Sequence, residues 1–344
     1  MKNAVKEQLC FFDAGRKSTI SSFARGTPYA LVVNNEAFQR LKDISFLGAI
    51  DYAYKTKIPK SERSRATHSL QVASLANYIS TERNYSDDLK RHLVVAALLH
   101  DIGHSPLSHS VEPYTKIQFG LGHHQLNQEI ITGRAPLGKT LKCELSKIVD
   151  IDFVLRLIDQ EATEEGSDLF NSPINIDTID GIVRSYLYLT GGVSDAQDDR
   201  MKIAQASFLQ QHDDQAREDI LDRFWRMKHQ VYSLLINSEM GLLADKSSEF
   251  YFQSKANDLT EPDLYKTEKD WEKKYHPLFD FFKQTKKKRV MPDWLCGQSV
   301  DYRKRRYDVN SNSEGHLRYI CKKELVPYFF EENNQSSVEL GLLF

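Results

Sequence analysis

Apolar residues recur every three or four positions along most of this 344-residue chain, which is the spacing of amphipathic helices. The pattern predicts helices at residues 36–48, 70–79, 87–100, 175–189 and 220–243. Ser86 is a plausible N-cap for the third of these, and Gly103 lies just past its end. Strand-like patterns are confined to residues 317–321 and 325–330, near the end of the chain. The sequence therefore predicts a mainly α fold.

The composition changes after about residue 245, where charged and aromatic residues become frequent. Basic clusters at residues 286–289 and 303–306 stand among aromatic residues in this part of the chain. We expect residues 1–245 to form a helical core and residues 246–344 a small helical or mixed appendage. The basic clusters are consistent with an ordinary solvated face or with a site that grips single-stranded nucleic acid.

Overall composition excludes several classes of protein. Hydrophobic residues make up 40% and charged residues 27% of the chain, which excludes a wholly disordered protein. No run of about 18 apolar residues is present, so no membrane-spanning helix is expected. The formal net charge is -2, so a site for a polyanion would have to be local. Four scattered cysteines without a C-x-x-C pair, and an N-terminus without an apolar signal segment, predict a cytoplasmic protein.

Two histidines continue the apolar stripes of predicted helices. His68 and His100 are expected to point inward, and an unpaired buried polar group costs about 1–3 kcal/mol, so each needs a partner. Together with Asp101 and a carboxylate from the segment that contains Asp177 and Asp180, they could hold one divalent cation. Two imidazoles and two carboxylates suit Mn, Fe, Zn, Ni or Mg, and an open catalytic site favours the five- or six-coordinate ions. A hydrogen-bonded core role explains one such histidine more simply, but not the ordered set.

The ordered set H…HD…D resembles the HD-domain metal-dependent phosphohydrolase superfamily, whose members share an HD-domain helical bundle. The closer resemblance is to the deoxynucleoside triphosphate (dNTP) triphosphohydrolase branch, which includes dGTPase-like and SAM-and-HD-domain proteins. The segments that carry this resemblance are Phe38-Gln39-Arg40-Leu41, Arg65 to Leu70, and His100 to His109. The similarity covers about residues 30–245 and fades afterwards.

The resemblance implies a site with a single divalent metal ion. Its expected ligands are His68, His100, Asp101 and Asp177, and Asp180 is the weaker choice for the fourth position. The two-metal relatives need further spaced histidines, which this sequence lacks outside the region close to the HD pair.

The resemblance also implies catalytic roles for residues that follow the HD pair. His104 corresponds to a histidine that lines the reacting phosphate. His109, Glu112 and His124 match a His–acid–His group, in which an imidazole would protonate the leaving oxygen. His123 is an alternative to His124, and the sequence does not choose between them.

Three further residues are expected to bind the substrate. Arg65 occupies the position of a phosphate-contacting arginine in the family. Lys228 and Tyr232 fall on a helix that the family uses for phosphate and base contacts, although an ordinary half-buried helix explains them equally well.

The expected function is hydrolysis of a nucleotide-type phosphoester by a dNTP triphosphohydrolase-like enzyme, with homo-oligomerisation implied by the resemblance. The sequence departs from the branch at Phe46, Gly181 and Ser185, where relatives carry the groups that read the sugar. Without those groups, strict dNTP specificity is not implied. A phosphodiesterase or nuclease acting on single-stranded nucleic acid is the alternative with the same chemistry.

Two alternatives belong to other functional classes. Residues 133–140 satisfy the P-loop pattern, but a working P-loop needs a buried strand before it, and the preceding segment is polar and helix-like. The other alternative is a non-catalytic nucleotide-sensing module that keeps the fold.

Overall fold

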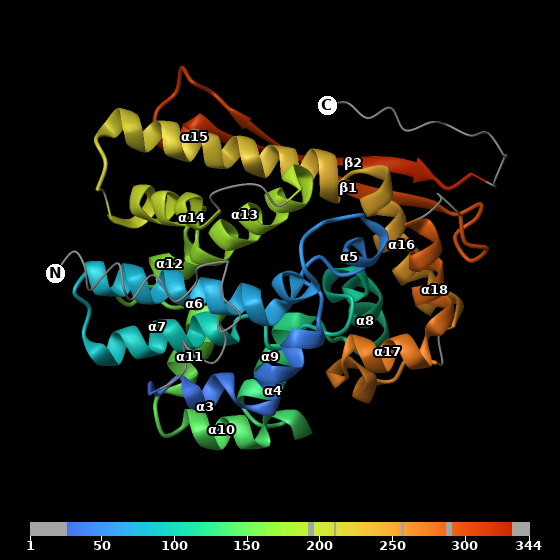
Figure 1. Ribbon diagram of the computed structural model, residues 1–344, viewed down its shortest axis with the longest axis horizontal. Coiled ribbons are helices and arrows are strands. Elements are labelled where there is room, and N and C mark those ends of the chain that lie inside the picture. The colour runs from blue at the N-terminus through green and yellow to red at the C-terminus, as the bar shows by residue number, and fades with distance from the viewer. Residues whose placement is uncertain (1–25, 192–195, 210, 256–257, 287–290, 332–344) are drawn as a thin grey trace.

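Helices make up most of the chain in the computed structural model, which describes residues 26–191, 196–209, 211–255, 258–286 and 291–331 (Figure 1). The helices are α3 (Ala30–Val33), α4 (Glu36–Arg40), α5 (Ile50–Ala53), α6 (Arg65–Glu82), α7 (Asp87–Leu99), α8 (Glu112–Phe119), α9 (His123–Ile131), α10 (Lys139–Leu145), α11 (Ile151–Ile158), α12 (Asp168–Asn171), α13 (Ile176–Thr190), α14 (Ala196–Ala204), α15 (Asp214–Val231), α16 (Glu239–Ser254), α17 (Glu268–Lys274) and α18 (His276–Thr285). Strands β1 (Ser299–Val309) and β2 (Tyr319–Phe329) form an antiparallel hairpin. The prediction of a mainly α fold is confirmed.

The helices that shape the centre of the molecule begin at residues able to cap them. Ser64, Ser86 and Asn175 each accept a backbone N–H from the first turn of α6, α7 and α13, respectively. Such a cap satisfies one of the amide groups that a helix N-terminus leaves without a partner. The cap predicted at Ser86 is therefore present.

The predicted helix at residues 36–48 is shorter in the structure. It ends with α4, and a 3₁₀ turn, η2 (Leu41–Asp43), follows. Ser45 then pairs with Ser64 in an isolated antiparallel bridge. Backbone pairing with the residues just before α6 therefore overrides the helical spacing of apolar positions at this point.

The other segments also differ in their boundaries. The prediction at 220–243 covers parts of α15 and α16 and a π-helical turn between them, η7 (Tyr232–Ile236). The predicted strand at 317–321 begins as a 3₁₀ turn, η9 (Gly315–Arg318), before β2 starts. The sequence pattern missed β1 because its residues are mostly charged or half-exposed, so it lacks a regular apolar alternation.

Two clusters of buried apolar side chains hold the helices together. The first joins α6, α7, α11, α13 and α15, and the second joins α5 and α8 to α16, α17 and α18. In the second cluster, Ala49 and Tyr114 share a core with Phe252 and Trp271, so residues on both sides of residue 245 pack together. The division of the chain at residue 245 stays a prediction from composition.

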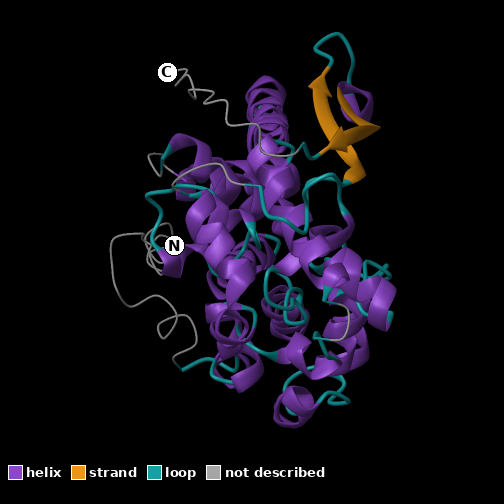
Figure 2. Ribbon diagram, turned by 90° about the vertical axis from the view of Figure 1, so that its right-hand side faces the viewer, coloured by secondary structure: helices purple, strands orange, loops and turns teal. Residues whose placement is uncertain are grey.

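The hairpin lies beside α15 at one corner of the helical body (Figure 2). Tyr307 on β1 and Tyr319 on β2 pack against Trp225 of α15, with ring centroids 5.6 and 5.0 Å from the indole. Among the described helices, none combines the length and the apolar character needed to cross a bilayer.

Candidate metal and catalytic site

Three helices bring the predicted metal ligands to one point. His68 lies in the first turns of α6, and His100 and Asp101 directly follow α7, which packs beside α6 (Figure 1). Asp177 lies in the first turn of α13, where the cap on Asn175 fixes the start of the helix. All four predicted ligands therefore project toward one another from separate parts of the chain.

The distances among these side chains are short. The Nε2 atoms of His68 and His100 are 3.1 Å apart, and Asp177 Oδ1 lies 3.1 and 3.7 Å from them. The carboxylate oxygens of Asp101 lie 3.6 Å from His68 Nε2 and 3.5 Å from His100 Nε2. The side chain of Asp177 is 56% exposed, whereas His68 is fully buried. The cluster is thus enclosed by protein on the His68 side and open toward solvent beside Asp177.

The electrostatics of the cluster favour positive charge. Burial alone would lower the pKa of His100, but the carboxylates of Asp101 and Asp177 raise it to about 9. Burial would raise the pKa of Asp177, and its hydrogen bonds with His100 and His68 hold it well below its usual range instead. Two carboxylates are therefore kept ionised around the two imidazoles.

The outer nitrogen of each imidazole has its own acceptor. His68 Nδ1 lies 2.6 Å from Asp180 Oδ2, and His100 Nδ1 lies 2.8 Å from the carbonyl oxygen of Ala97. Because a carbonyl oxygen only accepts, His100 must donate from Nδ1, and the Asp180 carboxylate fixes His68 in the same tautomer. When both rings are neutral, as metal ligands must be, the two Nε2 lone pairs face the same point; without a cation there, the raised pKa of His100 favours a proton on its Nε2.

Asp180 is held as a buried anion by two arginines. Arg184 Nε and Arg200 Nε donate to its carboxylate at 2.8 and 2.5 Å. Burial would raise the pKa of Asp180, but these guanidinium groups and His68 keep it well below its ordinary value. The sequence analysis ranked Asp180 as a weaker candidate ligand, and the structure places it behind His68 instead, on the outer face of the cluster.

Arg65 is buried against Asp101 rather than free to meet a ligand. Its Nη1 donates to Asp101 Oδ2 at 2.7 Å, its Nε to Ser108 Oγ at 3.1 Å and its Nη2 to the Phe46 carbonyl at 2.8 Å. All three nitrogens thus have protein partners, and the side chain orients a predicted ligand. Its contact with phosphate stays a prediction.

Next to the ligand cluster, Glu112 joins two histidines. His109 Nδ1 and His123 Nδ1 lie 3.0 and 2.9 Å from its two carboxylate oxygens. Burial would raise the pKa of Glu112, but these hydrogen bonds hold it well below its usual range, so it accepts from both rings. The Nε2 atoms of both histidines are left to accept or donate a proton.

His104 is buried between the ligand cluster and the Glu112 group. Its Nε2 lies 3.2 Å from Asp101 Oδ1, and its ring stacks on His123.

The prediction that His124 groups with Glu112 is wrong, because the His124 side chain does not reach Glu112. His124 instead faces Asp159, with Nδ1 3.5 Å from Oδ1, and its side chain is 51% exposed. Adjacent residues at the start of α9 point in different directions around the helix axis, so only His123 reaches Glu112. The alternative that the sequence left open is the one that the structure contains.

Lys228 and Tyr232 lie on one side of α15 and its continuation, facing the hairpin. The Lys228 ammonium lies over the rings of Trp225 and Tyr307, 5.0 and 4.9 Å from their centroids. Burial lowers its pKa to about 8, an effect that Arg305 adds to and Asp177 opposes. The Tyr232 hydroxyl accepts from Arg305 Nη1 at 3.3 Å. Both side chains therefore have partners, and their contact with substrate stays a prediction.

The three positions that depart from the related branch lie close together. The Phe46 ring centroid is 4.7 Å from that of His68, and the Arg65 guanidinium lies over the ring. A Cβ on Gly181 would meet the tip of the Phe46 ring at 3.7 Å and Asp177 Oδ1 at 4.0 Å. Ser185, one turn further along α13, is 3% exposed. A buried apolar ring therefore lies against His68, and a glycine without a side chain lies beside Asp177.

The P-loop pattern at residues 133–140 falls in a helical context. The segment follows helix α9, forms a short 3₁₀ turn and leads into α10, and no strand precedes it in the described chain. A Cβ on Gly138 would lie 1.9 Å from the Ile130 carbonyl oxygen, so this turn is packed tightly against α9. The geometry of a phosphate-cradling loop between strand and helix is absent from this segment.

Asn127 is a positioning side chain that the sequence analysis missed. Its Nδ2 donates to the His100 carbonyl and its Oδ1 accepts from the Gly103 amide, both at 2.6 Å. A Cβ on Gly103 would lie 2.4 Å from the backbone nitrogen of Asn127, so only glycine permits this approach. Gly103 is the only feature of the sequence that could have indicated a close approach at this position, and it does not identify Asn127 as the residue that approaches.

Comparisons with known proteins agree with this geometry. Residues 65–165 match the family model described as the HD domain. The chain is 30% identical over 172 residues to the uncharacterized protein MG461 of Mycoplasma genitalium, an alignment that covers 46% of this chain and 39% of that protein. It is 31% identical over 110 residues to a deoxyguanosinetriphosphate triphosphohydrolase-like protein of Rickettsia akari, covering 29% of this chain and 25% of that protein.

A solved structure shares the overall fold. The crystal structure of a hypothetical protein from Aquifex aeolicus superposes with a TM-score of 0.55 at 16% sequence identity. The match covers 80% of this chain and 75% of that one. At that level of identity the likeness extends to the fold alone. The curated relatives matched above are longer proteins, of which this chain spans less than half.

Proposed function

Residues 65–165 of this chain form an HD domain, and on that premise we propose that the protein is a metal-dependent phosphohydrolase. Its proposed substrate is a nucleotide-type phosphoester, cleaved in the manner of the dNTP triphosphohydrolases. The match to the Rickettsia protein, whose printed name refers to dGTP triphosphohydrolase, supports this substrate class.

One observation carries the proposal: two imidazole lone pairs and two carboxylates face a common point. When both rings are neutral, each with its proton on Nδ1, the two Nε2 lone pairs 3.1 Å apart repel each other unless a cation, either a proton or a metal ion, lies between them. Bonds of about 2.1 Å hold neighbouring ligand atoms about 3.0 Å apart around an octahedral ion and about 3.4 Å apart around a tetrahedral one, and the separations here, from 3.1 to 3.7 Å, span both values. His68, His100, Asp101 and Asp177 therefore fit one divalent ion, and an open catalytic site favours Mn, Fe or Mg over tetrahedral zinc.

The ion would supply Lewis-acid polarisation of a phosphoryl oxygen and would make a nearby water more acidic. The chain's own groups divide the remaining work. Asp180 and the Ala97 carbonyl hold the two imidazoles in the tautomer that presents Nε2, and Arg65 orients Asp101. These contacts fix the ligands before any substrate arrives, which lowers the cost of binding.

Proton transfer to the leaving oxygen is assigned to His109. Its side chain is 62% exposed beside the cluster, so Nε2 can meet a bound substrate. Burial lowers the pKa of His109, and Glu112, which accepts from its Nδ1, opposes that shift by favouring the imidazolium form that donates from Nε2. His123 on the other oxygen of Glu112 keeps that carboxylate oriented, and His104 lies between this group and Asp101.

The proposal is tested by metal analysis followed by a phosphate-release panel. Purified protein is expected to contain about one equivalent of a transition metal, or to bind one equivalent of added Mn²⁺. The panel sets dNTPs, NTPs, nucleoside monophosphates, cyclic dinucleotides and oligonucleotides side by side. Release of intact triphosphate supports the triphosphohydrolase mode, whereas free orthophosphate argues for another phosphohydrolase reaction.

Two variants separate the metal cluster from the P-loop pattern. The double variant His100→Ala, Asp101→Ala is expected to lose turnover and the bound metal. Lys139→Ala, which changes an exposed residue at the start of α10, is expected to keep both. Full turnover in the double variant, with loss in Lys139→Ala, would move the site to the P-loop segment.

A second candidate function, cleavage of single-stranded nucleic acid, is favoured by the charge on the hairpin. Arg305 faces Lys323 and Arg306 faces Lys322 across the two strands. Like charges placed opposite each other destabilise a two-stranded sheet. Asp308 already pairs with both Arg306 and Lys322, so the repulsion that an anionic polymer would relieve is the one between Arg305 and Lys323. The other basic cluster lies outside the described residues except for Lys286.

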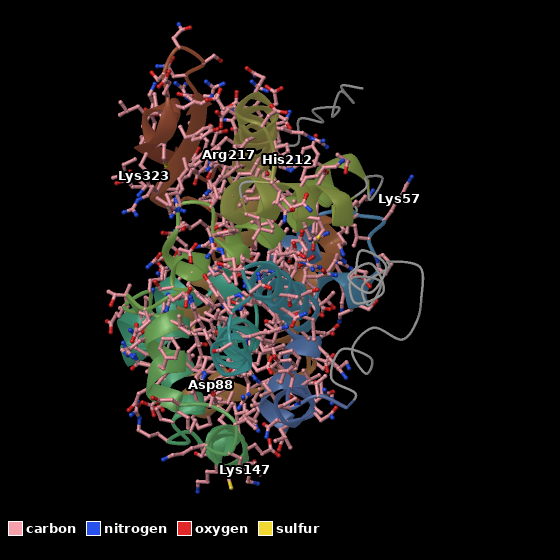
Figure 3. The ribbon with its side chains drawn as sticks, turned by 90° about the vertical axis from the view of Figure 1, so that its left-hand side faces the viewer. Lys57, Asp88, Lys147, His212, Arg217 and Lys323 are labelled. Carbon is pink, nitrogen blue, oxygen red and sulfur yellow. The ribbon has the colours of Figure 1, made fainter. Side chains whose placement is uncertain are left out.

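Oligonucleotide binding at increasing salt tests this second candidate. Lys323 on the hairpin and Lys147 at the far end of the molecule are both exposed, which makes them a matched pair (Figure 3). Lys323→Ser is expected to weaken binding of a fluorescent oligothymidylate, while Lys147→Ser leaves it unchanged. Affinity that does not fall as the salt concentration rises would contradict this candidate.

A further inference from the structure

Glu268, the first residue of α17, is a buried carboxylate with partners on two distant loops. It is 1% exposed, and its Oε1 accepts from the Ser45 amide at 2.9 Å, from the Ser45 hydroxyl at 2.5 Å and from the Leu107 amide at 3.0 Å. Its Oε2 accepts from the Tyr52 hydroxyl at 2.5 Å. Glu268 lies more than 100 residues beyond the segment that matches the HD domain.

The Leu107 amide belongs to the loop that carries the catalytic candidates. Residues 101–109, here named the HD loop, run from Asp101 through His104 to His109. Leu107 and Ser108 are consecutive non-glycine residues in the left-handed region, with φ of 62° and 47°. Such a conformation is strained in a residue other than glycine and persists only where the surroundings hold it. The carboxylate of Glu268 is one of the groups that hold this turn.

A second contact ties the other end of the HD loop to the same short segment. The buried guanidinium of Arg40 donates to the Ile102 carbonyl at 2.7 Å and to the Lys266 carbonyl at 3.3 Å. The segment 266–268 therefore reaches the HD loop at Ile102, through Arg40, and at Leu107, through Glu268.

The contacts continue from the turn to the ligand cluster. Ser108 Oγ donates to the Ser45 carbonyl at 2.8 Å and accepts from Arg65 Nε at 3.1 Å. Arg65 in turn donates to Asp101 at 2.7 Å. A shift of the turn would thus move both Arg65 and the carboxylate that it orients.

We propose that Glu268 is a positioning residue, through which the C-terminal part of the chain sets the placement of Asp101, His104 and His109 in the HD loop. This inference rests on the proposed function for its effect on turnover, but not for its effect on the loop itself. It gives residues 266–268 a direct role in the site, although they lie outside the HD-domain match.

The energetics favour a specific role over simple packing. Removing a carboxylate from water costs several kcal/mol unless hydrogen bonds replace its hydration. Four donor groups from three residues provide that replacement on Glu268. Two of these residues are Leu107, in the strained turn, and Ser45, in the isolated bridge. A residue that only filled space would not need donors from these two loops.

Hydrogen exchange and enzyme kinetics on the full-length protein test the proposal. Glu268→Ala removes all four acceptor contacts, whereas Glu268→Gln keeps one oxygen for the Leu107 and Ser45 amides. Glu272→Gln is the matched control, since Glu272 lies one turn later on α17 and, among the described residues, forms its ion pair with the surface lysine Lys283. Each variant is compared for amide exchange in peptides covering residues 101–110, for Mn²⁺ affinity, and for kcat and KM.

Glu268→Ala is expected to speed exchange in residues 101–110 at least tenfold, with α6 and α7 unchanged. Its kcat is expected to fall by about tenfold or more while KM stays within twofold, because the loop groups act on the reacting phosphate. Glu268→Gln should recover most of the loss, and Glu272→Gln should match the wild type. If Glu268→Ala does not fold, Glu268→Asp retains the charge, shortens the reach by one methylene and is expected to give the same local exchange.

Unchanged exchange in residues 101–110 would overturn the proposal, as would an increase spread evenly over all helices. A wild-type protein that binds Mn²⁺ but hydrolyses no phosphoester would instead contradict the proposed function. In that case the exchange of residues 101–110 and the Mn²⁺ affinity still decide whether Glu268 positions the loop.

Discussion

His68 Nδ1 and Asp180 Oδ2 lie 2.6 Å apart in the interior of the protein, and both side chains are completely buried. The contact joins α6 to α13 across 112 residues of sequence. Because Arg184 and Arg200 keep Asp180 ionised, the contact fixes His68 in the form whose Nε2 faces His100 and Asp177. A carboxylate that does not itself face the cluster therefore determines whether His68 can act as a ligand.

The first prediction concerns Asp180→Asn. The amide is a weaker acceptor and can turn its NH₂ group toward the ring, so the preference for the Nε2 lone pair is lost. Mn²⁺ affinity is expected to fall by about 10–100-fold, the range typical of groups that orient metal ligands. The measurement is a calorimetric titration at a temperature where the variant is folded.

Asp159→Asn is the control for that substitution. Asp159 pairs with His124, whose side chain is half-exposed and lies outside the ligand cluster. The same chemical change at Asp159 should therefore leave Mn²⁺ affinity within twofold. Equal affinities for the wild type and Asp180→Asn would show that the orientation of His68 does not depend on Asp180.

The sequence predicted the residues of this site better than their partners. His68, His100, Asp101 and Asp177 could be named because the ordered set H…HD…D resembles that of a known family. The residues that support the site come from unrelated segments: Asn127 of α9 donates to the His100 carbonyl, Arg200 of α14 to Asp180, and Glu268 of α17 accepts from the Leu107 amide. A hydrogen bond across 20 to more than 100 residues leaves no pattern in a single sequence, because only tertiary packing brings the two groups together.

The second prediction separates the two adjacent histidines at the start of α9. His109→Ala is expected to lower kcat by about 10² or more, as the loss of a general acid does. His123→Ala should lower it by about tenfold, because Glu112 loses one of the donors that orient it. His124→Ala should change kcat less than twofold. Steady-state hydrolysis assays at saturating substrate measure all three, and a larger effect at His124 than at His123 would contradict the geometry.

His123 and His124 also show a limit of prediction from the sequence pattern. A helix turns by about 100° per residue, so neighbours such as His123 and His124 face different surroundings. Only the true start of α9 decides which one faces Glu112, and helix boundaries are the least certain part of a prediction from sequence. The same limit explains why the helix expected at 36–48 ends at Arg40 in the structure.

The third prediction uses the half-buried carboxyl of Asp245, which accepts from Ser110 Oγ at 2.5 Å. Burial raises its pKa from 3.8 to about 6. Between about pH 4 and 6 the folded protein therefore holds a proton that the unfolded chain has released. The free energy of unfolding contributed by this group falls as the pH rises through that window, by at most about 3 kcal/mol.

Asp245→Asn removes this titration and still accepts from Ser110. The melting temperature of the variant is expected to rise relative to the wild type as the pH increases from 4 to 7. Thermal unfolding followed by circular dichroism at several pH values measures the difference. A constant difference across that range would show that Asp245 is ionised in the folded protein at all of these pH values.

The fourth prediction concerns Lys228, whose pKa is lowered by burial to about 8. Below that pH the side chain is a cation that attracts phosphate, and above it the charge is lost. KM of the wild type is therefore expected to rise as the pH increases from 8 to 9.5. In Lys228→Arg the guanidinium stays charged over this range, so KM should remain flat. Parallel KM profiles for the two proteins would remove Lys228 from the substrate-binding site.

The last prediction follows from the contact between Phe46 and His68 in the ligand cluster. A site that hydrogen-bonds a substrate hydroxyl can reject the analogue lacking it by about 10⁴–10⁵-fold, because its own polar groups are left unpaired. Phe46, Gly181 and the buried Ser185 offer no such group to a sugar beside Asp177. The kcat/KM value for GTP is therefore expected to exceed that for dGTP, which lacks the 2′-hydroxyl, by no more than about tenfold. Phe46→Leu should leave that ratio unchanged and lower the melting temperature, since the ring also packs under the guanidinium groups of Arg65 and Arg184. A ratio above 10² in the wild type would mean that residues other than these three read the sugar hydroxyl.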